Sequence, residues 1–366
     1  MSYIKGIVAA SLAAAVSMGS AVAQEEKVLH VYNWSDYIAE DTVANFEKET
    51  GIKVVYDVFD SNEVLEAKLL AGNTGFDIVV PSSDFLARQI QAGVFQQLDK
   101  SQLSNLKNMD ADIMKLLADK DPDNAHSMPY LGGTTGIGFN PKKVAAVMGP
   151  DFKLDSWDAV LKPENLSKLQ KCGVSFLNAP TEIMATVLHY MGKDPNSTNP
   201  ADYKEAGKLL ATLRPHIAYF HSSQYINDLA NGDTCVAIGW SGDVMQAAAR
   251  AEEAKNGVTV DYVIPKEGAL VFYDMLAIPA DAKHPENAHA FINYLMRPEV
   301  IAKVSNYVSY ASGNAASLPM VDEVLRNNPN IYPPAELKAK MFALKILPAK
   351  INREITREWT KVKTGK

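Results

Sequence analysis

Residues 29–37 read LHVYNWSDY, and this stretch decides how the rest of the chain is interpreted. Leu29 and Val31 alternate with His30 and Tyr32 as in a half-buried β-strand, and the alternation stops at Asn33. Aromatic, hydroxyl and carboxylate side chains follow at once. Ligands of open α/β sheets bind beyond the carboxyl ends of the strands, so this strand end is a candidate binding edge. The alternative is that the aromatic residues belong to the core and the carboxylate caps the next helix.

The residues that follow alternate between helix and strand patterns. We expect helices at about 39–50 and 61–71, and strands at 52–58 and 76–80. This order predicts a parallel sheet with right-handed crossovers. Hydrogen-bonding side chains also follow the strand at 76–80, so two such strand ends share one edge of the sheet. That coincidence favours a binding site over the core interpretation.

A second set of α/β elements follows a glycine-rich, extended segment at 126–139. The glycines suit a segment that crosses between domains and flexes there, and their spacing does not match a phosphate-binding loop. Beyond it the patterns predict strands at 173–177, 234–240 and 258–264, helices at 181–191, 201–213 and 243–255, and an amphipathic helix that starts near Pro285. The chain has 366 residues, which exceeds the usual length of one domain, so we expect two.

Composition indicates an exported protein. Residues 1–23 resemble a secretory signal peptide, with Lys5, an apolar run at 7–16 and small residues at 21–23. Removing that segment takes away Lys5 from the 36 basic residues and none of the 43 acidic ones, which leaves a net charge of −8. This charge argues against nucleic acid and anionic membrane surfaces as partners. No later apolar run is long enough to insert into a membrane.

The two cysteines, Cys172 and Cys235, each precede a strand-like run. An exported chain meets an oxidising compartment, which favours one disulfide between them. Two separate buried thiols are the alternative. Two cysteines are too few for a zinc site, and His216 and His221 have no recognised ligand spacing, so we expect no metal and no other cofactor.

The best sign of an enzyme is the segment GWSGD at 239–243, which lies between a buried strand and a helix as a nucleophile elbow does. An elbow needs glycine where Asp243 stands, because the turn is tight. Asp274 followed by His284 or His289 has the chain order of a triad, yet both histidines belong to helix patterns. A serine hydrolase that uses Ser241 is therefore a minor alternative, and we expect no enzyme.

Acidic and aromatic residues gather at the predicted strand ends. Such a set suits an alkylammonium ligand, whose charged head needs carboxylates and ring faces while its methylenes lie on apolar rings. A receptor for an amino acid would need an Arg or Lys aimed at the ligand carboxylate, and these clusters contain none. The residues of the set are Trp34, Asp36, Tyr37, Asp84, Glu182, Trp240, Asp243, Phe272, Asp274 and Tyr310.

Four motifs give the chain a resemblance to the periplasmic polyamine-binding proteins of bacterial ABC transporters, most closely to the putrescine-binding members: YNWSDYI at 32–38, YDVFDSNE at 56–63, YFHSSQY at 219–225, and GWSGD. The resemblance covers nearly all of the chain after the signal peptide. It implies an α/β type II fold of two lobes, each a mainly parallel sheet flanked by helices, joined by hinge crossings. The implied ranges are 24–131 with 254–307 for lobe one and 132–253 with 308–366 for lobe two.

The resemblance also implies roles. Rings would enclose the alkyl chain, Asp243 and Asp274 would hold one ammonium group, Ser35, Asp36 and Glu182 would serve the other end, and Ser82 would bond nearby. The implied protein is a periplasmic monomer that delivers its ligand to an ABC permease. The residues of the aromatic box would be Trp34, Tyr37, Trp240, Phe272 and Tyr310.

Three positions depart from the family pattern. Gly132 stands where a tryptophan is usual, which predicts a larger pocket or a looser hinge. Asp84 occupies a position that resembles a serine in the putrescine receptors, and Met245 replaces an aromatic residue. Because an added acid and more room suit longer cations, spermidine and agmatine are alternatives to putrescine.

Overall fold

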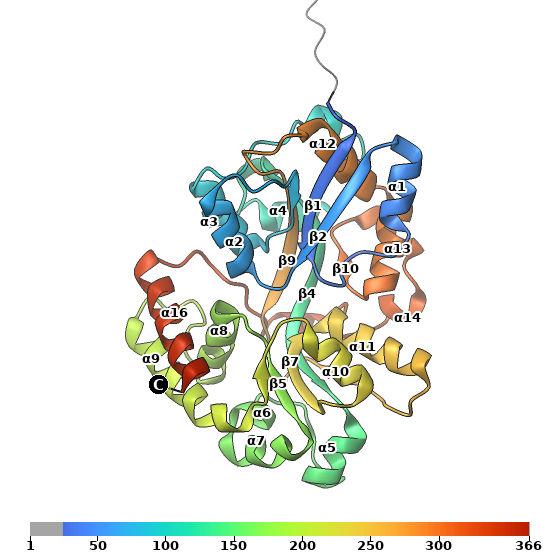
Figure 1. Ribbon diagram of the computed structural model, residues 1–366. Coiled ribbons are helices and arrows are strands. Elements are labelled where there is room, and N and C mark those ends of the chain that lie inside the picture. Colours follow the sequence, from blue (N-terminus) through green and yellow to red (C-terminus); the bar gives the residue numbers. More distant parts are fainter. Residues whose placement is uncertain (1–24, 366) are drawn as a thin grey trace, which may run out of the picture.

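The computed structural model describes residues 25–365, and the signal peptide predicted for residues 1–23 lies outside them. The chain forms two lobes, one above the other in Figure 1, which are joined by long strands. Each lobe has its own hydrophobic core. Within the described residues, no helix is long and apolar enough to cross a membrane.

Lobe one is built on the strand that opens the sequence. β1 (Val28–Trp34) pairs in parallel with both β2 (Lys53–Phe59) and β3 (Ile78–Val79), as the strand–helix pattern predicts. The carboxyl ends of these strands therefore point the same way, toward lobe two (Figure 1). The helices of this lobe are α1 (Thr42–Thr50), α2 (Asn62–Ala71), α3 (Ser83–Gln91), α4 (Ala111–Leu117), α12 (Pro285–Leu295) and α13 (Pro298–Val308).

Lobe two repeats the arrangement. β5 (Val174–Phe176) pairs in parallel with β6 (Tyr219–Phe220) and β7 (Val236–Trp240). The helices that follow and flank these strands are α5 (Pro141–Met148), α6 (Asp158–Leu161), α7 (Pro163–Leu169), α8 (Pro180–Tyr190), α9 (Pro200–Leu213), α10 (Gln224–Asn231) and α11 (Ser241–Ala254). Two short helices, α14 (Glu323–Arg326) and α15 (Ala335–Lys338), precede α16 (Ala349–Thr364), which packs on α8 and α9.

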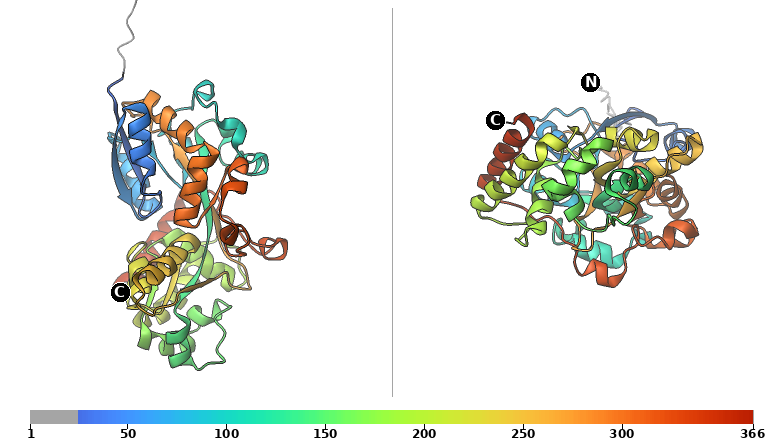
Figure 2. Two further views of the ribbon diagram at one scale, coloured as in Figure 1. Left: turned by 90° about the vertical axis from the view of Figure 1, so that its right-hand side faces the viewer. Right: turned by 90° about the horizontal axis from the view of Figure 1, so that it is seen from below.

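Two antiparallel strands connect the lobes. β4 (Ser127–Phe139) pairs with β9 (Val271–Ala277), and beyond β9 it continues beside β7, so one mixed sheet runs through the molecule. The register between β4 and β9 shifts between Pro129 and Gly132. Figure 2 shows the two lobes side-on, with β4 running from one into the other. The extended crossing segment predicted at 126–139 is thus a single strand of the sheet.

Two segments pack differently from the lobe ranges that we expected. β8 (Asp261–Val263) pairs with β4 at its lobe-two end, and Val260 and Tyr262 belong to the lobe-two core. β10 (Ala311–Ser312) pairs with β4 at Leu131 and Gly132, and Tyr310 belongs to the lobe-one core. The boundaries at 254 and 308 were therefore misplaced by roughly one element each. The rest of the residue-by-residue division remains our proposal.

The predicted disulfide is present. Cys172 and Cys235 precede the neighbouring strands β5 and β7, and their sulfurs are bonded. The pairing closes a loop across 63 positions. On the chain-entropy account such a loop closure stabilises the folded state by about 4 kcal/mol.

Candidate ligand-binding site

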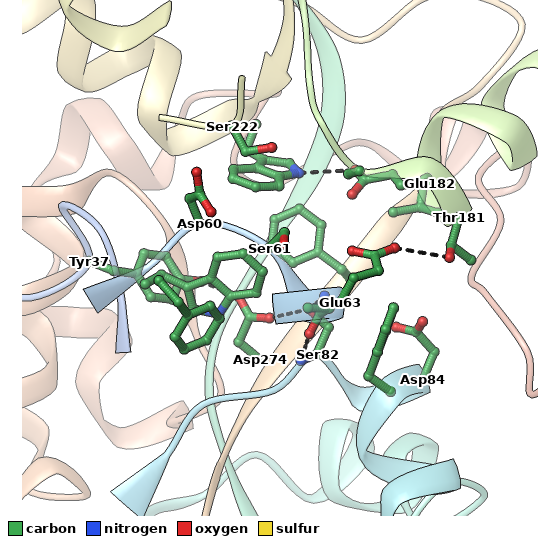
Figure 3. Close-up of a pocket in the computed structure, with 18 of the residues that line it drawn as sticks. Tyr37, Asp60, Ser61, Glu63, Ser82, Asp84, Thr181, Glu182, Ser222 and Asp274 are labelled. Atoms are coloured by element: carbon green, nitrogen blue, oxygen red, sulfur yellow. Dashed lines mark hydrogen bonds between the residues drawn. The ribbon is translucent and has the colours of Figure 1, made fainter. Parts of the chain in front are cut away.

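A pocket lies between the lobes, where the strand ends of both face each other. The space between the atoms that line it is about 690 Å³, a volume that includes solvent at its open side. Figure 3 shows acidic, hydroxyl and aromatic side chains around it. The lining residues are Trp34, Ser35, Tyr37, Phe59, Asp60, Ser61, Asn62, Glu63, Ser82, Asp84, Phe85, Ala179, Thr181, Glu182, Ser222, Trp240, Asp243, Leu270, Phe272, Asp274, Tyr310 and Leu344.

Aromatic rings from both lobes meet in this pocket. Trp34, the last residue of β1, donates its indole N–H to the Val80 carbonyl at 2.8 Å, which fixes the ring. Trp240, the last residue of β7, meets Trp34 edge to face with the ring centroids 5.4 Å apart. Phe272 on β9 lies 6.5 Å from Trp240, and Tyr310 lies 6.3 Å from Phe272. These rings give the pocket apolar walls.

Asp274 is the buried carboxylate of the lobe-one side. It comes from β9 and is 3% exposed. Tyr37 donates its hydroxyl to Oδ2 at 2.8 Å, and Ser82 donates to Oδ1 at 2.6 Å. Asn62 orients Ser82, because its amide oxygen accepts from the Ser82 N–H and its NH₂ group donates to the Ser82 hydroxyl. Asp274 is therefore held rigidly, but by neutral partners only.

Asp243 is its counterpart from lobe two. It lies in the first turn of α11 and is 4% exposed. Tyr310 donates to Oδ1 at 2.7 Å and Tyr225 donates to Oδ2 at 2.8 Å. Tyr310 also accepts from the Asp243 backbone N–H at 3.2 Å. Its ring lies so close to Gly242 that a Cβ there would come within 2.2 Å of a ring carbon, so only glycine fits.

A second acidic group lies at the other side of the pocket. Glu63, Asp84 and Glu182 stand in the first turns of α2, α3 and α8, where the helix dipole favours a negative charge. Glu63 accepts from the Thr181 hydroxyl at 3.1 Å. Glu182 accepts from the Trp240 indole N–H at 3.0 Å and from the Thr135 hydroxyl. Figure 3 shows these three carboxylates together, across the pocket from Tyr37 and Asp274.

Burial raises the pKa values of these acids, because ionised carboxylates lose their hydration in the pocket. The pKa of Asp243, of Asp274 and of Glu182 rises to about 7 in each case. Burial is the largest cause for all three, and the hydrogen bonds to each carboxylate oppose it. The same cause raises the pKa of Glu63 and Asp84. The pocket thus contains acids that a cation would favour in their ionised form.

Contacts between the lobes close the pocket at its rim. Arg250 on α11 donates to Asp36 of lobe one at 2.5 Å. His221 of lobe two lies 3.9 Å from Asp60. Together with the Glu63–Thr181 hydrogen bond, these pairs hold the lobes in a closed arrangement.

The structure brings together every predicted binding residue except Asp36. The Asp36 carboxylate turns away from the pocket to pair with Arg250, and the residue has a left-handed backbone with φ of 54°. Our expectation that Asp36 serves the ligand amine lacks support in this geometry. The sequence analysis missed Phe59, which ends β2, and Asp60, Ser61 and Glu63, which follow it as Ser35 follows β1. The strand-end rule would have found them, had the motif at 56–63 been interpreted as a site.

Of the three departures from the family pattern, only Asp84 lines the pocket. A Cβ at Gly132 would come within 2.8 Å of the Tyr273 ring, so that ring occupies the space and the pocket gains no room there. The structure therefore gives no support to a larger pocket at Gly132, and the alternative of a looser hinge stays a prediction. Met245 lies outside the lining, where its sulfur is 3.9 Å from the Asn328 amide nitrogen.

Two α/β lobes that enclose a pocket at their strand ends define a solute-binding protein. Residues 41–333 match the family of bacterial extracellular solute-binding proteins, and the chain belongs to that family. It is 63% identical over 365 residues to the putrescine-binding periplasmic protein PotF of Escherichia coli, with 100% of this chain and 98% of that one covered. It is 58% identical to the putrescine-binding periplasmic protein SpuD of Pseudomonas aeruginosa, with 99% and 98% covered.

A third relative, a putrescine/agmatine-binding protein of Pseudomonas aeruginosa, is 45% identical over 99% of this chain and 100% of its own length. Among solved structures, a putative spermidine/putrescine ABC transporter protein from Listeria monocytogenes superposes with a TM-score of 0.83 at 32% identity, covering 93% of this chain and 100% of that one. The predicted two-lobed fold and periplasmic location are confirmed.

Proposed function

We propose that this protein is a periplasmic receptor that binds a polyamine between its lobes and delivers it to an ABC permease. One observation carries the proposal: six acidic side chains line an aromatic pocket whose lining contains no lysine or arginine. These carboxylates have no lysine or arginine partner inside the pocket, and an ammonium group of the ligand would supply the missing positive charge. The putrescine-binding relatives support the same class of ligand.

The two acidic groups suit a ligand that is charged at both ends. Asp243 and Asp274 would hold one ammonium group, and Glu182 with Asp84 and Glu63 would hold the other. The rings of Trp34 and Trp240 would cover the methylenes between them. A cation on a ring face contributes about 0.5 to 2 kcal/mol, with the larger values where water is excluded.

Putrescine is the ligand that the relatives favour, while Asp84 and Glu63 favour a longer or larger cation at the same end. Agmatine and spermidine therefore remain alternatives within the class. A zwitterion such as 4-aminobutyrate would place its carboxylate among acids and is disfavoured by the charge of the lining.

We infer that the protein works as a monomer and transforms nothing. Ser241 accepts a hydrogen bond from the Thr134 N–H and does not line the pocket. His284 pairs with Asp77, and His289 lies between the Pro285 carbonyl and the Asp99 N–H. Neither histidine meets Ser241, so the geometry favours a receptor over a serine hydrolase. Turnover of an ester that is abolished in Ser241→Ala would contradict this inference.

Calorimetric titration of the purified chain tests the proposal. Putrescine, cadaverine, agmatine and spermidine are compared with 4-aminobutyrate at one pH and ionic strength. We expect one site per chain, saturated by at least one of the amines, and at least tenfold weaker binding of 4-aminobutyrate. Equal affinity for the zwitterion, or no binding of any amine, would overturn the polyamine assignment.

A further inference from the structure

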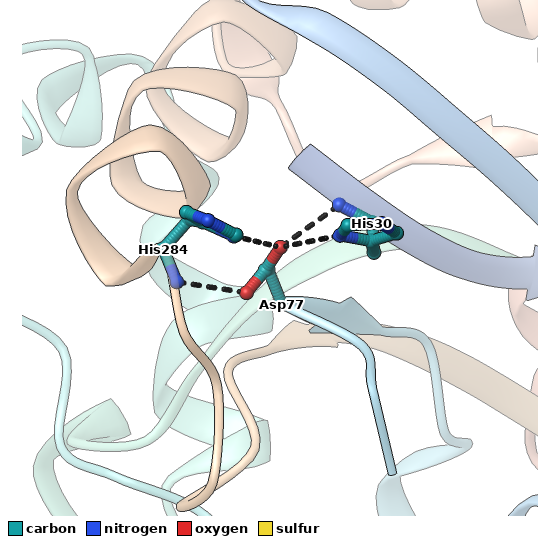
Figure 4. A group of neighbouring side chains, drawn as sticks. All are labelled: His30, Asp77 and His284. Atoms are coloured by element: carbon teal, nitrogen blue, oxygen red, sulfur yellow. Dashed lines mark hydrogen bonds and ion pairs between the residues drawn. The ribbon is translucent and has the colours of Figure 1, made fainter. Parts of the chain in front are cut away.

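Three side chains that play no part in the pocket meet at the opposite end of lobe one. His30 lies near the start of β1, Asp77 lies just before β3, and His284 lies just before α12. Figure 4 shows the two imidazoles on opposite sides of the Asp77 carboxylate. His30 and Trp34 are four residues apart on β1, a separation of about 13 Å, so this cluster is distinct from the ligand pocket.

We propose that His30, Asp77 and His284 form a zinc site. One possible ligand atom from each of the three residues lies within 4.8 Å of the other two. The contacts of Asp77 Oδ2 with Nδ1 of both imidazoles indicate these three atoms as the ligands. His284 Nδ1 is 3.0 Å and His30 Nδ1 is 3.4 Å from Oδ2. Zinc bonds of about 2.0 to 2.1 Å in a tetrahedron place neighbouring ligand atoms about 3.3 Å apart. The two distances from Nδ1 to Oδ2 are therefore already close to those of a zinc site. A small rotation of either ring would shorten the distance between the two Nδ1 atoms.

Hydrogen-bond geometry at Asp77 supports a metal. Oδ2 accepts from the His30 backbone N–H at 2.9 Å and also meets both imidazole nitrogens, which is one partner more than its two lone pairs serve. A zinc ion between the three ligand atoms would take the place of both imidazole protons. The sharing of a single oxygen by two rings is then explained by coordination.

The surroundings hold the carboxylate as a metal ligand needs to be held. Asp77 Oδ1 accepts from the backbone N–H groups of Lys283 and His284, each at 2.9 Å, so the carboxylate is fixed from behind. The side chain of Asp77 is 2% exposed, while that of His30 is 34% exposed. The ion would enter from the His30 side, and water would complete the tetrahedron there.

Two imidazoles and one carboxylate favour zinc or another first-row transition metal over calcium or magnesium, which prefer oxygen ligands. The three ligands come from the starts of β1, β3 and α12, elements that lie far apart in the sequence. A bound ion would cross-link them without contact to either acidic group of the pocket. The site is therefore structural, and its existence does not depend on which solute the pocket binds.

Zinc titration of the untagged chain, after treatment with a chelator, tests the proposal. We expect one zinc ion to bind per chain by calorimetry and to raise the melting temperature. His30→Gln and His284→Gln should each lower zinc affinity at least tenfold. His126→Gln is the matched control, because His126 Nδ1 meets Asp121 at 2.9 Å without a second histidine, and it should leave zinc affinity unchanged.

Two further readouts keep the test decisive if one variant folds poorly. Cobalt added to the unmodified chain should give the visible absorption of a tetrahedral complex, and stoichiometric zinc should abolish it. Amine binding in the folded His30 and His284 variants should stay within twofold of the original, since the pocket is remote. No zinc uptake by the unmodified chain, or undiminished uptake in both variants, would show that the cluster is a hydrogen-bonded group without a metal.

Discussion

Asp274 is the residue on which the proposed ligand contact depends most directly. It is buried and its partners are the hydroxyl groups of Tyr37 and Ser82, so no cation of the protein competes for it. We predict that Asp274→Asn weakens polyamine binding by at least tenfold, about 1.4 kcal/mol, because the charge is lost while the shape is kept. Calorimetry measures the change. Asp261→Asn, at an exposed position, serves as the control, and equal affinities for both variants would remove Asp274 from the site.

The pKa values of the pocket acids predict how binding varies with pH. Asp243, Asp274 and Glu182 have pKa values raised to about 7 by burial, so they take up protons as the pH falls below 7. Neutral carboxyls attract an ammonium group far less, and the alkylamine itself keeps its charge throughout this range. We therefore predict at least tenfold weaker binding at pH 5.5 than at pH 8. Calorimetry in buffers of different ionisation enthalpy should show proton release on binding near pH 7.

The stability of the ligand-free protein changes with pH in the opposite direction to its affinity for polyamine. A carboxyl whose folded-state pKa exceeds its unfolded value stabilises the fold fully below the unfolded pKa, and this stability is lost as the pH rises through about 7. The ligand-free protein should thus lose stability between pH 5 and pH 8, and added polyamine should restore the most stability at the upper end of this range.

For binding, an affinity that stays constant from pH 8 to pH 5.5 would contradict the electrostatic account.

For single residues, the sequence predicted which side chains line the pocket better than it predicted which residues they contact. The strand-end rule placed Trp34 and Ser82 at the pocket because strand direction alone sets the edge on which they lie, whereas Asp274 lies in the middle of β9. Asp36 follows the same strand, yet its side chain reaches Arg250, a residue 214 positions away. No spacing in the sequence reveals that pair. The same holds for His30, Asp77 and His284, which meet only because three segments fold together.

The start of α11 shows how an element sets the position of a site residue. Gly242 lies against the Tyr310 ring, and Tyr310 in turn donates to Asp243. We predict that Gly242→Ala lowers polyamine affinity by at least tenfold, because the added methyl group displaces the ring. Tyr310→Phe removes the hydroxyl without displacing the ring, so its effect should be smaller. Calorimetry ranks the two variants, and Ala249→Gly, on the exposed side of α11, controls for helix stability.

An effect of Gly242→Ala no larger than that of the Ala249 control would show that the ring can move without cost to the site.

The sequence predicted this helix at 243–255, two residues late, because the serine and glycine at its start look like a turn. The strand before this helix is buried, so the chain passes from the strand directly into the helix without a loop. The strand at 258–264 was also predicted, but its partner was not, since pairing with β4 depends on how far that strand extends into lobe two.

Closure of the whole molecule involves the pair of Arg250 and Asp36, which joins the lobes across the pocket rim. Both side chains are about one-third exposed, and pairs of this kind contribute up to about 1 kcal/mol. We predict that Arg250→Ala weakens polyamine binding two- to fivefold, and less at high salt. Arg297→Ala is the matched control, because Arg297 pairs with Glu49 at the same distance of 2.5 Å within lobe one.

Equal effects of the two arginine variants would mean that the pair across the rim plays no part in closure.

The two-lobed architecture itself could be predicted, because two strand–helix series separated by a crossing segment leave few other arrangements. The exact boundaries could not, since β8 and β10 each pair with the distant strand β4 and stay beside the helix before them, α11 and α13 respectively. Long-range pairing of that kind is decided by tertiary packing.

The register shift between Pro129 and Gly132 has a mechanical consequence. β4 and β9 pair between the lobes, and the interruption of their ladder between Pro129 and Gly132 is where this pair of strands can bend. A pair of strands that bends at one place lets the two lobes rotate about a single axis, between an open and a closed arrangement. Fluorescent dyes on α1 and α16 should accordingly report two discrete separations by single-molecule energy transfer. Added polyamine would change the time spent at each separation and leave both lengths as they are.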